Sequence, residues 1–509
     1  MSYDFLNTAK IAVLGSGTMG IGIVQLAILN QHATYLFDLD LTKIQQAVEG
    51  LKKTLNQLVD KGKYTQVQVD EALARLTIST DIAQLQDAQL VIEAIVEKKE
   101  IKQSVFKQLA EICAQETIFA SNTSSISITA ISSTIPHPER VVGLHFFNPA
   151  PVMKLVEIVK GLKTPVELCE ALKALMLRWN KVPVITKSTP GFIVNRIARP
   201  FYSEGFRALQ DHVTSFEKLD YSFRECGGFA MGPCELTDLI GQDVNFSVTQ
   251  TVYQEFFTEP RYRPSLIQKE LVDAGSLGRK SGQGFYQYDD RNQYERFTIS
   301  SQTQALNSAW NVKVLGQWYE DSVLKRFNLH ISQVSEVDEM ILDDIHIRPS
   351  QGESAILSDQ QNKLVLLDWH HDFAQAKSVV LSHNTLCLAQ DIEKVEHWFA
   401  SQNIQVIWIS DHPGLLTLRT IATLINEACE ASLHNIASQD DIDQAMRYGV
   451  NYPCGPYTWL NKIGAKRILT TLQNLYEIYG EEKYRPSIYL KKLVAVQAIE
   501  LNHKLSKAG

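Results

Sequence analysis

The sequence lacks the features that mark membrane-bound, secreted and nucleic-acid-binding proteins. No apolar run in its 509 residues approaches the ~20 residues of a membrane-spanning helix. The opening residues, MSYDFLNTAKIAVLG, have neither the cationic start nor the cleavage site of a signal peptide. Acidic residues outnumber basic ones, 57 to 49, whereas nucleic-acid-binding proteins usually carry a basic excess. We therefore expect a cytoplasmic protein that binds neither a membrane nor nucleic acid.

Cysteine is absent from the patterns that bind metals or form disulfides. The seven cysteines include no C-x-x-C pair, which is the spacing that zinc sites commonly use. Their odd number does not suit a disulfide framework either. We expect reduced thiols and no metal site.

A nucleotide-binding pattern is present near the start of the chain. The apolar residues 11–14 suit a strand buried on both faces, and Gly15, Gly17 and Gly20 follow as G-x-G-x-x-G before an apolar helical stretch. Such glycines allow a tight turn and let a diphosphate approach the helix N-terminus closely. Asp38 ends the next predicted strand, where an acid that binds the ribose hydroxyls is expected. Because a carboxylate there repels a 2′-phosphate, the pattern predicts NAD rather than NADP.

Further strand-then-helix segments indicate an α/β, doubly wound sheet of the Rossmann type. Residues 90–94 and the stretch TIFASNTSSISI are typical of strands, each followed by polar residues. Ligands of such sheets bind beyond the carboxyl ends of the parallel strands. The polar residues at these ends, which we expect near the far ribose and the nicotinamide, are Glu97, Lys102, Asn122 and Ser124.

The stretch VVGLHFFNPAPVMKLVEIV contains a candidate catalytic pair. His145 follows a buried strand, and Glu157 lies in an otherwise apolar strand, where a carboxylate is costly unless it is paired. The NPAP segment forces a turn, so the two strands can bring Glu157 beside His145. A neutral imidazole could then take the proton of a secondary alcohol as hydride leaves to NAD, while the carboxylate orients the ring. The alternative is a core histidine bonded to a buried acid.

Together these motifs resemble the L-3-hydroxyacyl-CoA dehydrogenase family. The resemblance rests on VLGSGTMG, ASNTSSISIT, GLHFFNPAPVMKLVEIV, TPGFIVNRIARP and GRKSGQGFYQY, and it covers essentially residues 1–288. It implies oxidation of an L-3-hydroxyacyl-CoA to the 3-ketoacyl-CoA with NAD. His145 would be the general base and Glu157 its orienting partner.

The same resemblance implies roles for further residues. Ser124 and Asn195 would hydrogen-bond the substrate oxygen at C3 or the thioester carbonyl, although an asparagine in a helix is more often a cap or a surface residue. Lys61, in a helical hairpin after the second strand, would lie near the CoA phosphates. The full set expected to bind NAD, counting the glycine motif, is Gly15, Gly17, Thr18, Met19, Gly20, Asp38, Glu97, Lys102, Asn122 and Asn148.

The chain also contains an internal repeat. The tetrapeptide YRPS begins at Tyr262 and again at Tyr484. Other residues recur at a nearly constant offset: Pro190-Gly191 as Pro413-Gly414, Arg196 as Arg419, Glu204 as Glu427, Asp220 as Asp443, Gly232-Pro233 as Gly455-Pro456, and Gly241 as Gly464. The repeat predicts two copies of one all-helical domain. Each YRPS should open a helix, with Pro264 or Pro486 in its first turn.

These patterns predict four parts. More than one part is expected from the length of 509 residues alone, because single hydrophobic cores stop growing at roughly 250 to 300 residues. The four parts are a NAD-binding Rossmann domain (1–188), a helical substrate and dimerisation domain (189–288), a degenerate Rossmann-like segment (289–411) and a second helical copy (412–509). In the third part, VKVLGQW echoes IAVLGSG, VVLSHNT echoes IFASNTS, and VIWISDHPG echoes VITKSTPG.

The second half should bind no NAD and catalyse nothing. Gln317-Trp318-Tyr319 replace the glycine motif after Gly316, and their bulk would block a diphosphate. Asn195 corresponds to Leu418, and HFFNP has no counterpart. We interpret His370 and His371 as surface or linker residues.

Two expectations concern partners and substrate. Members of the family typically dimerise through their helical domains, so a tandem copy could form a pseudo-dimer within one chain, with a homo-oligomer also possible. The length and the duplicated domain resemble bacterial members associated with phenylacetate breakdown, whose substrate is thought to be 3-hydroxyadipyl-CoA. Its terminal carboxylate would need a cation, for which the nearest candidates are Arg196, Arg199 and Arg207. The alternatives are a short-chain 3-hydroxybutyryl-CoA dehydrogenase and, in another class, a non-catalytic NAD or acyl-CoA binding protein.

Overall fold

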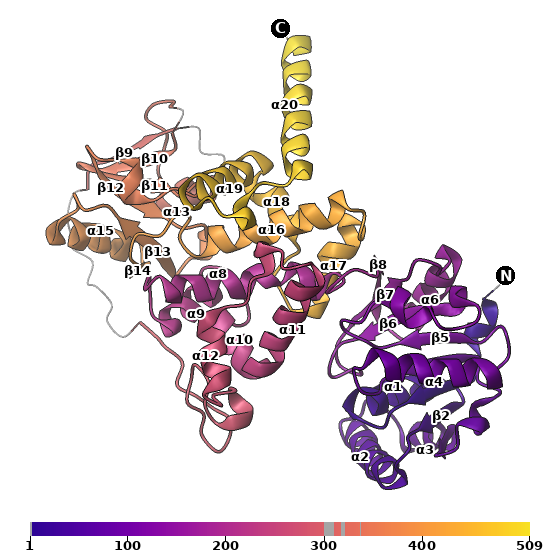
Figure 1. Cartoon of the computed structure of the whole chain (residues 1–509). Helices are drawn as coiled ribbons and strands as arrows, with labels where there is room; N and C mark the ends of the chain where they lie inside the picture. The colour runs from indigo at the N-terminus through magenta and orange to yellow at the C-terminus, as the bar shows by residue number, and fades with distance from the viewer. Residues whose placement is uncertain (1–2, 300–309, 317–320, 336, 509) are drawn as a thin grey trace. The chain divides into compact units, whose positions relative to one another are not determined.

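The computed structural model describes residues 3–299, 310–316, 321–335 and 337–508, which form two compact units (Figure 1). The first unit comprises residues 1–196 and 434–450, and the second comprises residues 197–433 and 451–509. The predicted block at Gln317, Trp318 and Tyr319 lies outside the described residues. Among the helices that are described, none is both long and apolar enough to cross a membrane.

The first unit is built around an eight-stranded sheet in the order β3-β2-β1-β4-β5-β6-β7-β8. Its strands are β1 (Ile11–Leu14), β2 (Thr34–Phe37), β3 (Leu76–Ser79), β4 (Leu90–Glu93), β5 (Ile118–Ser121), β6 (Val141–Phe146), β7 (Leu155–Lys160) and β8 (Val182–Lys187). All neighbours from β3 to β6 pair in parallel, whereas β7 runs antiparallel to β6 and parallel to β8. The predicted Rossmann-type parallel sheet is therefore confirmed.

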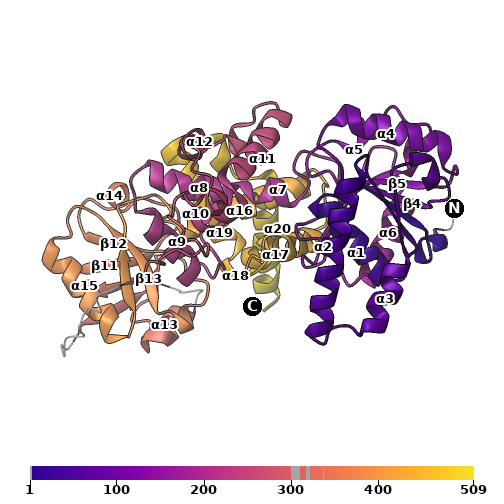
Figure 2. The same ribbon diagram turned by 90° about the horizontal axis from the view of Figure 1, so that it is seen from below.

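Helices cover both faces of this sheet (Figure 2). They are α1 (Thr18–Leu29), α2 (Leu41–Asp60), α3 (Gln66–Ala74), α4 (Lys99–Ile112), α5 (Ile128–Ser132), α6 (Val166–Arg178) and α7 (Val194–Ile197). Because side chains alternate along a strand, Ile11 and Val13 of β1 pack into the core with α1 and α6, while Ala12 and Leu14 pack into the core with α4 and α5. This double burial explains why the strand is apolar throughout.

One helix of the first unit comes from the far end of the chain. Helix α17 (Gln439–Gly449) packs against β7 and β8, and the backbone N–H of Lys187 donates to Ile436 O at 2.9 Å. A Cβ on Gly449 would lie 2.6 Å from Leu155 Cδ2, so glycine permits the close approach of this helix to β7. The sequence patterns did not predict that a helix of the second copy completes the first unit.

The second unit contains the remaining helices of both helical copies. The first copy contributes α8 (Arg199–Gln210), α9 (Phe216–Glu225), α10 (Pro233–Ile240), α11 (Gln242–Glu255) and α12 (Leu266–Asp273). The second contributes α16 (Thr417–Leu433), α18 (Pro456–Ile463), α19 (Ala465–Tyr479) and α20 (Ile488–Ala508). Helices α8 and α16, which open the two copies, lie side by side (Figure 1).

The repeated YRPS segment lies just before a helix rather than inside one. Its tyrosine ends a short 3-10 helix, η4 (Pro260–Tyr262) in the first copy and η7 (Glu482–Tyr484) in the second. Ser265 caps α12, so Pro264 precedes the cap, and the prediction that the proline lies in the first turn is wrong. The serine takes the capping position that the pattern had not considered.

A six-stranded sheet completes the second unit, in the order β14-β13-β12-β11-β10-β9. Its strands are β9 (Val312–Leu315), β10 (Glu339–Leu342), β11 (Ile345–Pro349), β12 (Lys363–Leu367), β13 (Ser378–His383) and β14 (Gln405–Trp408), with helices α13 (Asp321–Phe327), α14 (Ala355–Ser358) and α15 (Ala389–Ser401). Strands β12, β13 and β14 pair antiparallel and then parallel, as β6, β7 and β8 do, and α15 connects β13 to β14 as α6 connects β7 to β8. This part therefore repeats only the end of the first sheet.

This topology corrects two of the predicted echoes. Strand β13, which contains VVLS, corresponds to β7, so its likeness to the β5 sequence IFAS is misleading. Strand β9 pairs antiparallel with β10 at a sheet edge, whereas β1 is a central parallel strand. Short buried strands share apolar residues whatever their position, so resemblance between them is weak evidence of correspondence.

Candidate active site

The glycine motif forms a cradle with room for a diphosphate. Gly15 has φ +101°, and a Cβ there would lie 2.5 Å from Ala94 O. A Cβ on Gly20 would collide with Gly15 O, while a Cβ on Gly17 would meet no atom within 4 Å. Helix α1 starts at Thr18 with no side-chain cap, so its N-terminus can serve an anion. The residues present thus fit the diphosphate of NAD, and Met19, in the first turn of α1, packs against the core beneath.

Asp38 lies just beyond the carboxyl end of β2, next to this cradle. Its Oδ2 accepts hydrogen bonds from Ser16 N at 2.9 Å and from Ser16 Oγ at 2.7 Å. Burial alone would raise the pKa of Asp38, but these hydrogen bonds outweigh it and lower the pKa below its usual value. Asp38 is therefore charged, as an acceptor for ribose hydroxyls must be.

The polar residues predicted beyond β4 and β5 form one connected cluster. The ammonium of Lys102 is almost fully buried and contacts Glu93 Oε1 at 2.6 Å and Glu97 Oε2 at 3.0 Å. Glu97 Oε1 accepts from Ser124 N at 3.1 Å, and Asn122 Oδ1 accepts from Phe146 N at 2.8 Å. Burial would raise the pKa of Glu97, but Lys102 outweighs it and the pKa is lowered. The carboxylates hold Lys102 in a fixed position at the end of the sheet.

Glu93 was not among the predicted site residues. It ends β4, is fully buried, and accepts a hydrogen bond from Ser121 Oγ at 2.6 Å as well as the contact from Lys102. The signal that could have found it is the one used for Glu157, a carboxylate in an otherwise apolar strand. Its role visible here is to anchor Lys102.

His145 and Glu157 face each other across β6 and β7. The register places the two residues directly opposite, and His145 Nδ1 lies 2.7 Å from Glu157 Oε2. The other carboxylate oxygen accepts from Ile193 N at 3.0 Å and Val194 N at 3.1 Å. Glu157 is fully buried, and Phe147 packs on the imidazole with ring centroids 4.5 Å apart. Because Nδ1 is engaged, Nε2 is the nitrogen that can exchange a proton.

Two of the other predicted residues lie together, and two lie apart from them. Asn195 follows Val194 in α7, and its Nδ2 is 3.5 Å from Ser124 O. Asn148 is exposed in the loop between β6 and β7. Lys61 is the exposed C-terminal cap of α2. The structure therefore brings Ser124 and Asn195 into one neighbourhood and leaves Lys61 on a separate helix end.

Comparison with known proteins identifies the family. The 3-hydroxyacyl-CoA dehydrogenase NAD binding domain matches residues 10–189, and the C-terminal domain of the same family matches residues 191–288 and again 414–505. The 3-hydroxyadipyl-CoA dehydrogenase of Escherichia coli K12 is 43% identical over 97% of this chain and 99% of its own length. The chain belongs to the 3-hydroxyacyl-CoA dehydrogenase family. It is an enzyme that uses NAD to oxidise 3-hydroxyacyl-CoA, as the motifs predicted.

One solved structure and one shorter relative extend this comparison. The crystal structure of a 3-hydroxybutyryl-CoA dehydrogenase from Escherichia coli K12 covers 96% of this chain and 99% of its own, with a TM-score of 0.86 and 43% identity. The human mitochondrial hydroxyacyl-coenzyme A dehydrogenase is 36% identical over 55% of this chain and 90% of its own length. Residues 347–413 match the 3-hydroxybutyryl-CoA dehydrogenase reduced Rossmann-fold domain, which accounts for the incomplete second sheet.

The second sheet of this dehydrogenase has a buried carboxylate at the position of the histidine. At the repeat offset, Asp368 takes the place of His145 and Val380 that of Glu157. The buried carboxylate of Asp368 accepts from the backbone N–H groups of Leu416, Thr417 and Leu418, at 3.1, 2.7 and 3.0 Å. It thus holds the start of α16 as Glu157 holds the start of α7. Asp368 therefore has the structural role of Glu157, but the histidine that would act as a base is not present at this position.

The prediction for His370 and His371 is wrong. His370 is buried, 7% exposed, and its Nδ1 accepts a hydrogen bond from Asp372 N at 3.0 Å. The backbone N–H of His371 donates to Cys226 O at 2.7 Å, and a Cβ on Gly228 would touch its ring. Both residues follow Asp368 in the turn that corresponds to HFFNPA; His370 is buried and His371 is half-buried, so the turn is packed and not a linker.

Proposed function

We propose that His145 is the general base and Glu157 its orienting partner in the oxidation of a 3-hydroxyacyl-CoA. The observation that carries the proposal is the buried pair of His145 Nδ1 and Glu157 Oε2, 2.7 Å apart. With Nδ1 held by the carboxylate, Nε2 takes the hydroxyl proton of the substrate while NAD, when bound, accepts the hydride. The carboxylate then stabilises the imidazolium that forms.

The neighbouring polar residues complete the proposal. Ser124 and Asn195 bind the substrate oxygen at C3 or the thioester carbonyl. Their hydrogen bonds stabilise negative charge that develops on that oxygen during the reaction. Asn122, Glu97 and Lys102 bind the far part of NAD, together with Asn148 from its loop. Lys61 is assigned to the CoA phosphates on family resemblance. The predicted division at residues 188, 288 and 411 and the cytoplasmic location remain part of this proposal.

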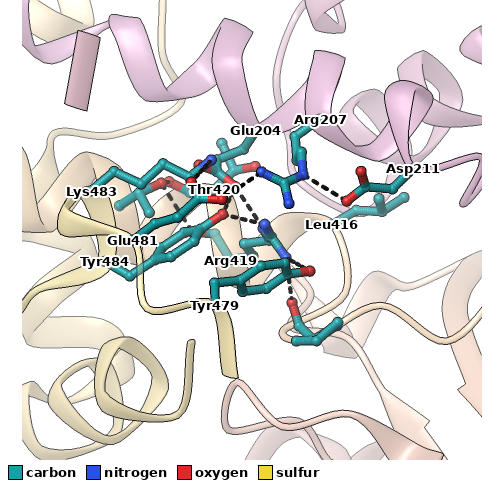
Figure 3. Close-up of polar contacts among 12 residues, drawn as sticks. Glu204, Arg207, Asp211, Leu416, Arg419, Thr420, Tyr479, Glu481, Lys483 and Tyr484 are labelled. Atoms are coloured by element: carbon teal, nitrogen blue, oxygen red, sulfur yellow. Dashed lines mark hydrogen bonds and ion pairs between the residues drawn. The ribbon is translucent and has the colours of Figure 1, made fainter. Parts of the chain in front are cut away.

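The proposed substrate is 3-hydroxyadipyl-CoA, and a role in phenylacetate breakdown goes with it. Support comes from the Escherichia coli relative of that name, which matches nearly the whole chain. The alternative, 3-hydroxybutyryl-CoA, is supported by the name of the similar solved structure. Among the predicted cations for the terminal carboxylate, Arg207 is already engaged, because its guanidinium pairs with Asp211 at 2.7 Å and Glu481 at 2.8 Å (Figure 3). Arg199, which pairs with no carboxylate of the described residues, remains a candidate.

A direct comparison of the two substrates tests this choice. If the enzyme recognises the terminal carboxylate, kcat/KM for 3-hydroxyadipyl-CoA should exceed that for 3-hydroxybutyryl-CoA by roughly 100-fold, because a cation left without its anion is costly. NADH formation measured at equal enzyme and NAD concentrations gives both values. Equal kcat/KM values would favour the short-chain alternative, and no turnover of either substrate would favour a binding protein.

We also propose that the two helical copies form a pseudo-dimer. Tyr262 Oη of the first copy donates to Glu427 Oε1 of the second at 2.6 Å, and Tyr484 Oη of the second copy donates to Glu204 Oε2 of the first at 2.9 Å. Such reciprocal contacts are typical of an interface between two identical surfaces related by a two-fold axis. The YRPS tyrosine is thus a contact between the copies, and tethering keeps that contact at high effective concentration.

Removing the second half should expose this surface. A fragment that ends at Tyr288 lacks Glu427 and Tyr484, so Tyr262 and Glu204 lose their partners. We expect it to dimerise or aggregate, as measured by size-exclusion chromatography with light scattering, and the full chain at the same concentration is the control. A fragment that remains a monomer with full activity would contradict the pseudo-dimer.

A further inference from the structure

We propose that the second unit contains a binding site for a small oxyanion, a phosphate or a carboxylate group, at the N-terminus of α12 beside Arg199. Arg199 belongs to α8, Ser265 is the N-cap residue of α12, and Ser203 lines the same cavity. None of these residues takes part in the proposed proton transfer. The inference goes beyond the proton transfer, and for a carboxylate ligand it rests on the proposed substrate 3-hydroxyadipyl-CoA.

Arg199 is a buried cation without a matching anion. It is 4% exposed, its Nη1 donates to Thr249 Oγ1 at 2.8 Å, and its guanidinium lies over the ring of Tyr202 at 4.9 Å. In the part of the chain that the structure describes, no carboxylate pairs with it, and its Nε has no hydrogen-bond partner. A buried guanidinium in this state is costly, so an anion beside it would be stabilising.

Arg199 lines a small cavity that adjoins a larger one. The small cavity holds about 10 Å³, and the larger holds about 440 Å³. The two share the lining residues Ser203, Arg261, Arg263 and Ser265. Ser265 occupies the N-cap position of α12, but its hydroxyl is buried, has no hydrogen-bond partner and makes no capping hydrogen bond. The unpaired cation of Arg199 thus lines the small cavity, and Ser265 at the start of α12 lines both cavities, a combination that suits an oxyanion bound where the two adjoin.

The other charges on the cavity wall are largely compensated. Arg207 and Lys483 both contact Glu481 (Figure 3), Glu482 pairs with Arg485 at 2.7 Å, and Arg261 lies 3.7 Å from Glu427. Arg263, in contrast, is exposed and forms no ion pair with the described residues. Among the described residues of the cavity wall, the uncompensated cations are thus Arg199 and Arg263, which line the same cavity as Ser265.

In the second helical copy, the position that corresponds to the cavity is occupied by side chains of that copy. Asn426 stands where the first copy has Ser203, and its Oδ1 accepts from Ser487 N at 2.8 Å while its Nδ2 donates to Arg485 O at 3.0 Å. Ser487 is fully buried. Ala422 stands where the first copy has Arg199. The first copy therefore has a shorter residue at the helix N-terminus and a cation beside it, and both differences favour a bound anion.

Binding measurements on the full chain, without NAD or substrate, test the proposal. Inorganic phosphate and adipate, titrated by calorimetry at constant ionic strength, are the probes for the two sources of the anion. We expect one of them to bind once per chain, and Arg199→Met and Ser203→Asn each to weaken it by about 10-fold or more. Ser203→Asn should close the cavity as Asn426 does, and therefore raise Tm in the absence of anion.

A matched variant in the second copy separates the site from a general effect. Asn426→Ser opens the corresponding helix N-terminus beside Ala422, so it should lower Tm and leave anion affinity and stoichiometry unchanged. Preference for phosphate would assign the site to a phosphorylated or free phosphate ligand, and preference for adipate to the end of a dicarboxylic acyl chain. The proposal is wrong if neither anion binds the wild type, or if folded Arg199→Met and Ser203→Asn bind as tightly as it does. Because turnover is not measured, failure here leaves the dehydrogenase assignment untouched.

Discussion

His145→Gln should lower kcat for 3-hydroxyacyl-CoA oxidation by about 10²- to 10⁴-fold. Glutamine keeps much of the volume and can still donate to Glu157, but it cannot accept and release the hydroxyl proton. Since the imidazole is held by Nδ1 to a buried carboxylate, the change removes the base and little of the surrounding structure. Steady-state NADH formation across substrate concentrations gives kcat and KM for both proteins.

The second half offers a control for this experiment. His370→Gln makes the same substitution in the turn that corresponds to HFFNPA. His370 lies two residues after Asp368, and no proton transfer is proposed for it. The substitution should leave kcat within about two-fold, while NAD affinity, measured by fluorescence titration, should be unchanged in both variants. If His145→Gln kept more than a tenth of wild-type kcat, another group would have to be the base.

Glu204→Ala should lower the free energy of unfolding of the second unit by about 3–5 kcal/mol. Glu204 is almost fully buried, and its carboxylate binds Arg419 Nε at 2.6 Å and Lys483 Nζ at 3.0 Å (Figure 3). Without it, the buried Arg419 and the half-buried Lys483 lose the carboxylate that both of them contact. Urea unfolding followed by circular dichroism measures the change. Tyr484→Phe removes the hydrogen bond to Glu204 and the one accepted from Arg419 but leaves the three charges in place, so it should cost less, about 1–2 kcal/mol.

The same residue gives the stability a defined pH dependence. Burial would raise the pKa of Glu204, but Lys483 and Arg419 outweigh it and lower the pKa from the ordinary 4.5 to about 2. A group with a depressed folded-state pKa stabilises the protein above its unfolded pKa and loses that contribution as the pH falls toward the folded value. Wild-type stability should therefore fall between about pH 4.5 and 2, and Glu204→Ala should show a shallower fall. Identical pH profiles would contradict the proposed charge cluster.

The local residues were enough to predict the cofactor cradle and the His145–Glu157 pair. Gly15 is required by its positive φ and Gly20 by its close contact with the backbone of Gly15, and the apolar strand around Glu157 left that carboxylate only a neighbouring strand as partner. Both features follow from short-range sterics and from the cost of burying a charge. The repeat likewise predicted two helical copies, because it preserves residues over a long register.

The tertiary structure alone decided what each repeated residue does. Glu204 and Glu427 look alike in the sequence, yet their partners lie in the opposite copy, and YRPS became a contact rather than a helix start. Asp368 has no motif that links it to Glu157, although both carboxylates hold the start of a helix. Only the structure shows that Arg199 is buried and pairs with no carboxylate of the described residues. Such roles depend on contacts between residues that are far apart in the sequence. A local sequence pattern does not predict which distant group will pair with a buried charge.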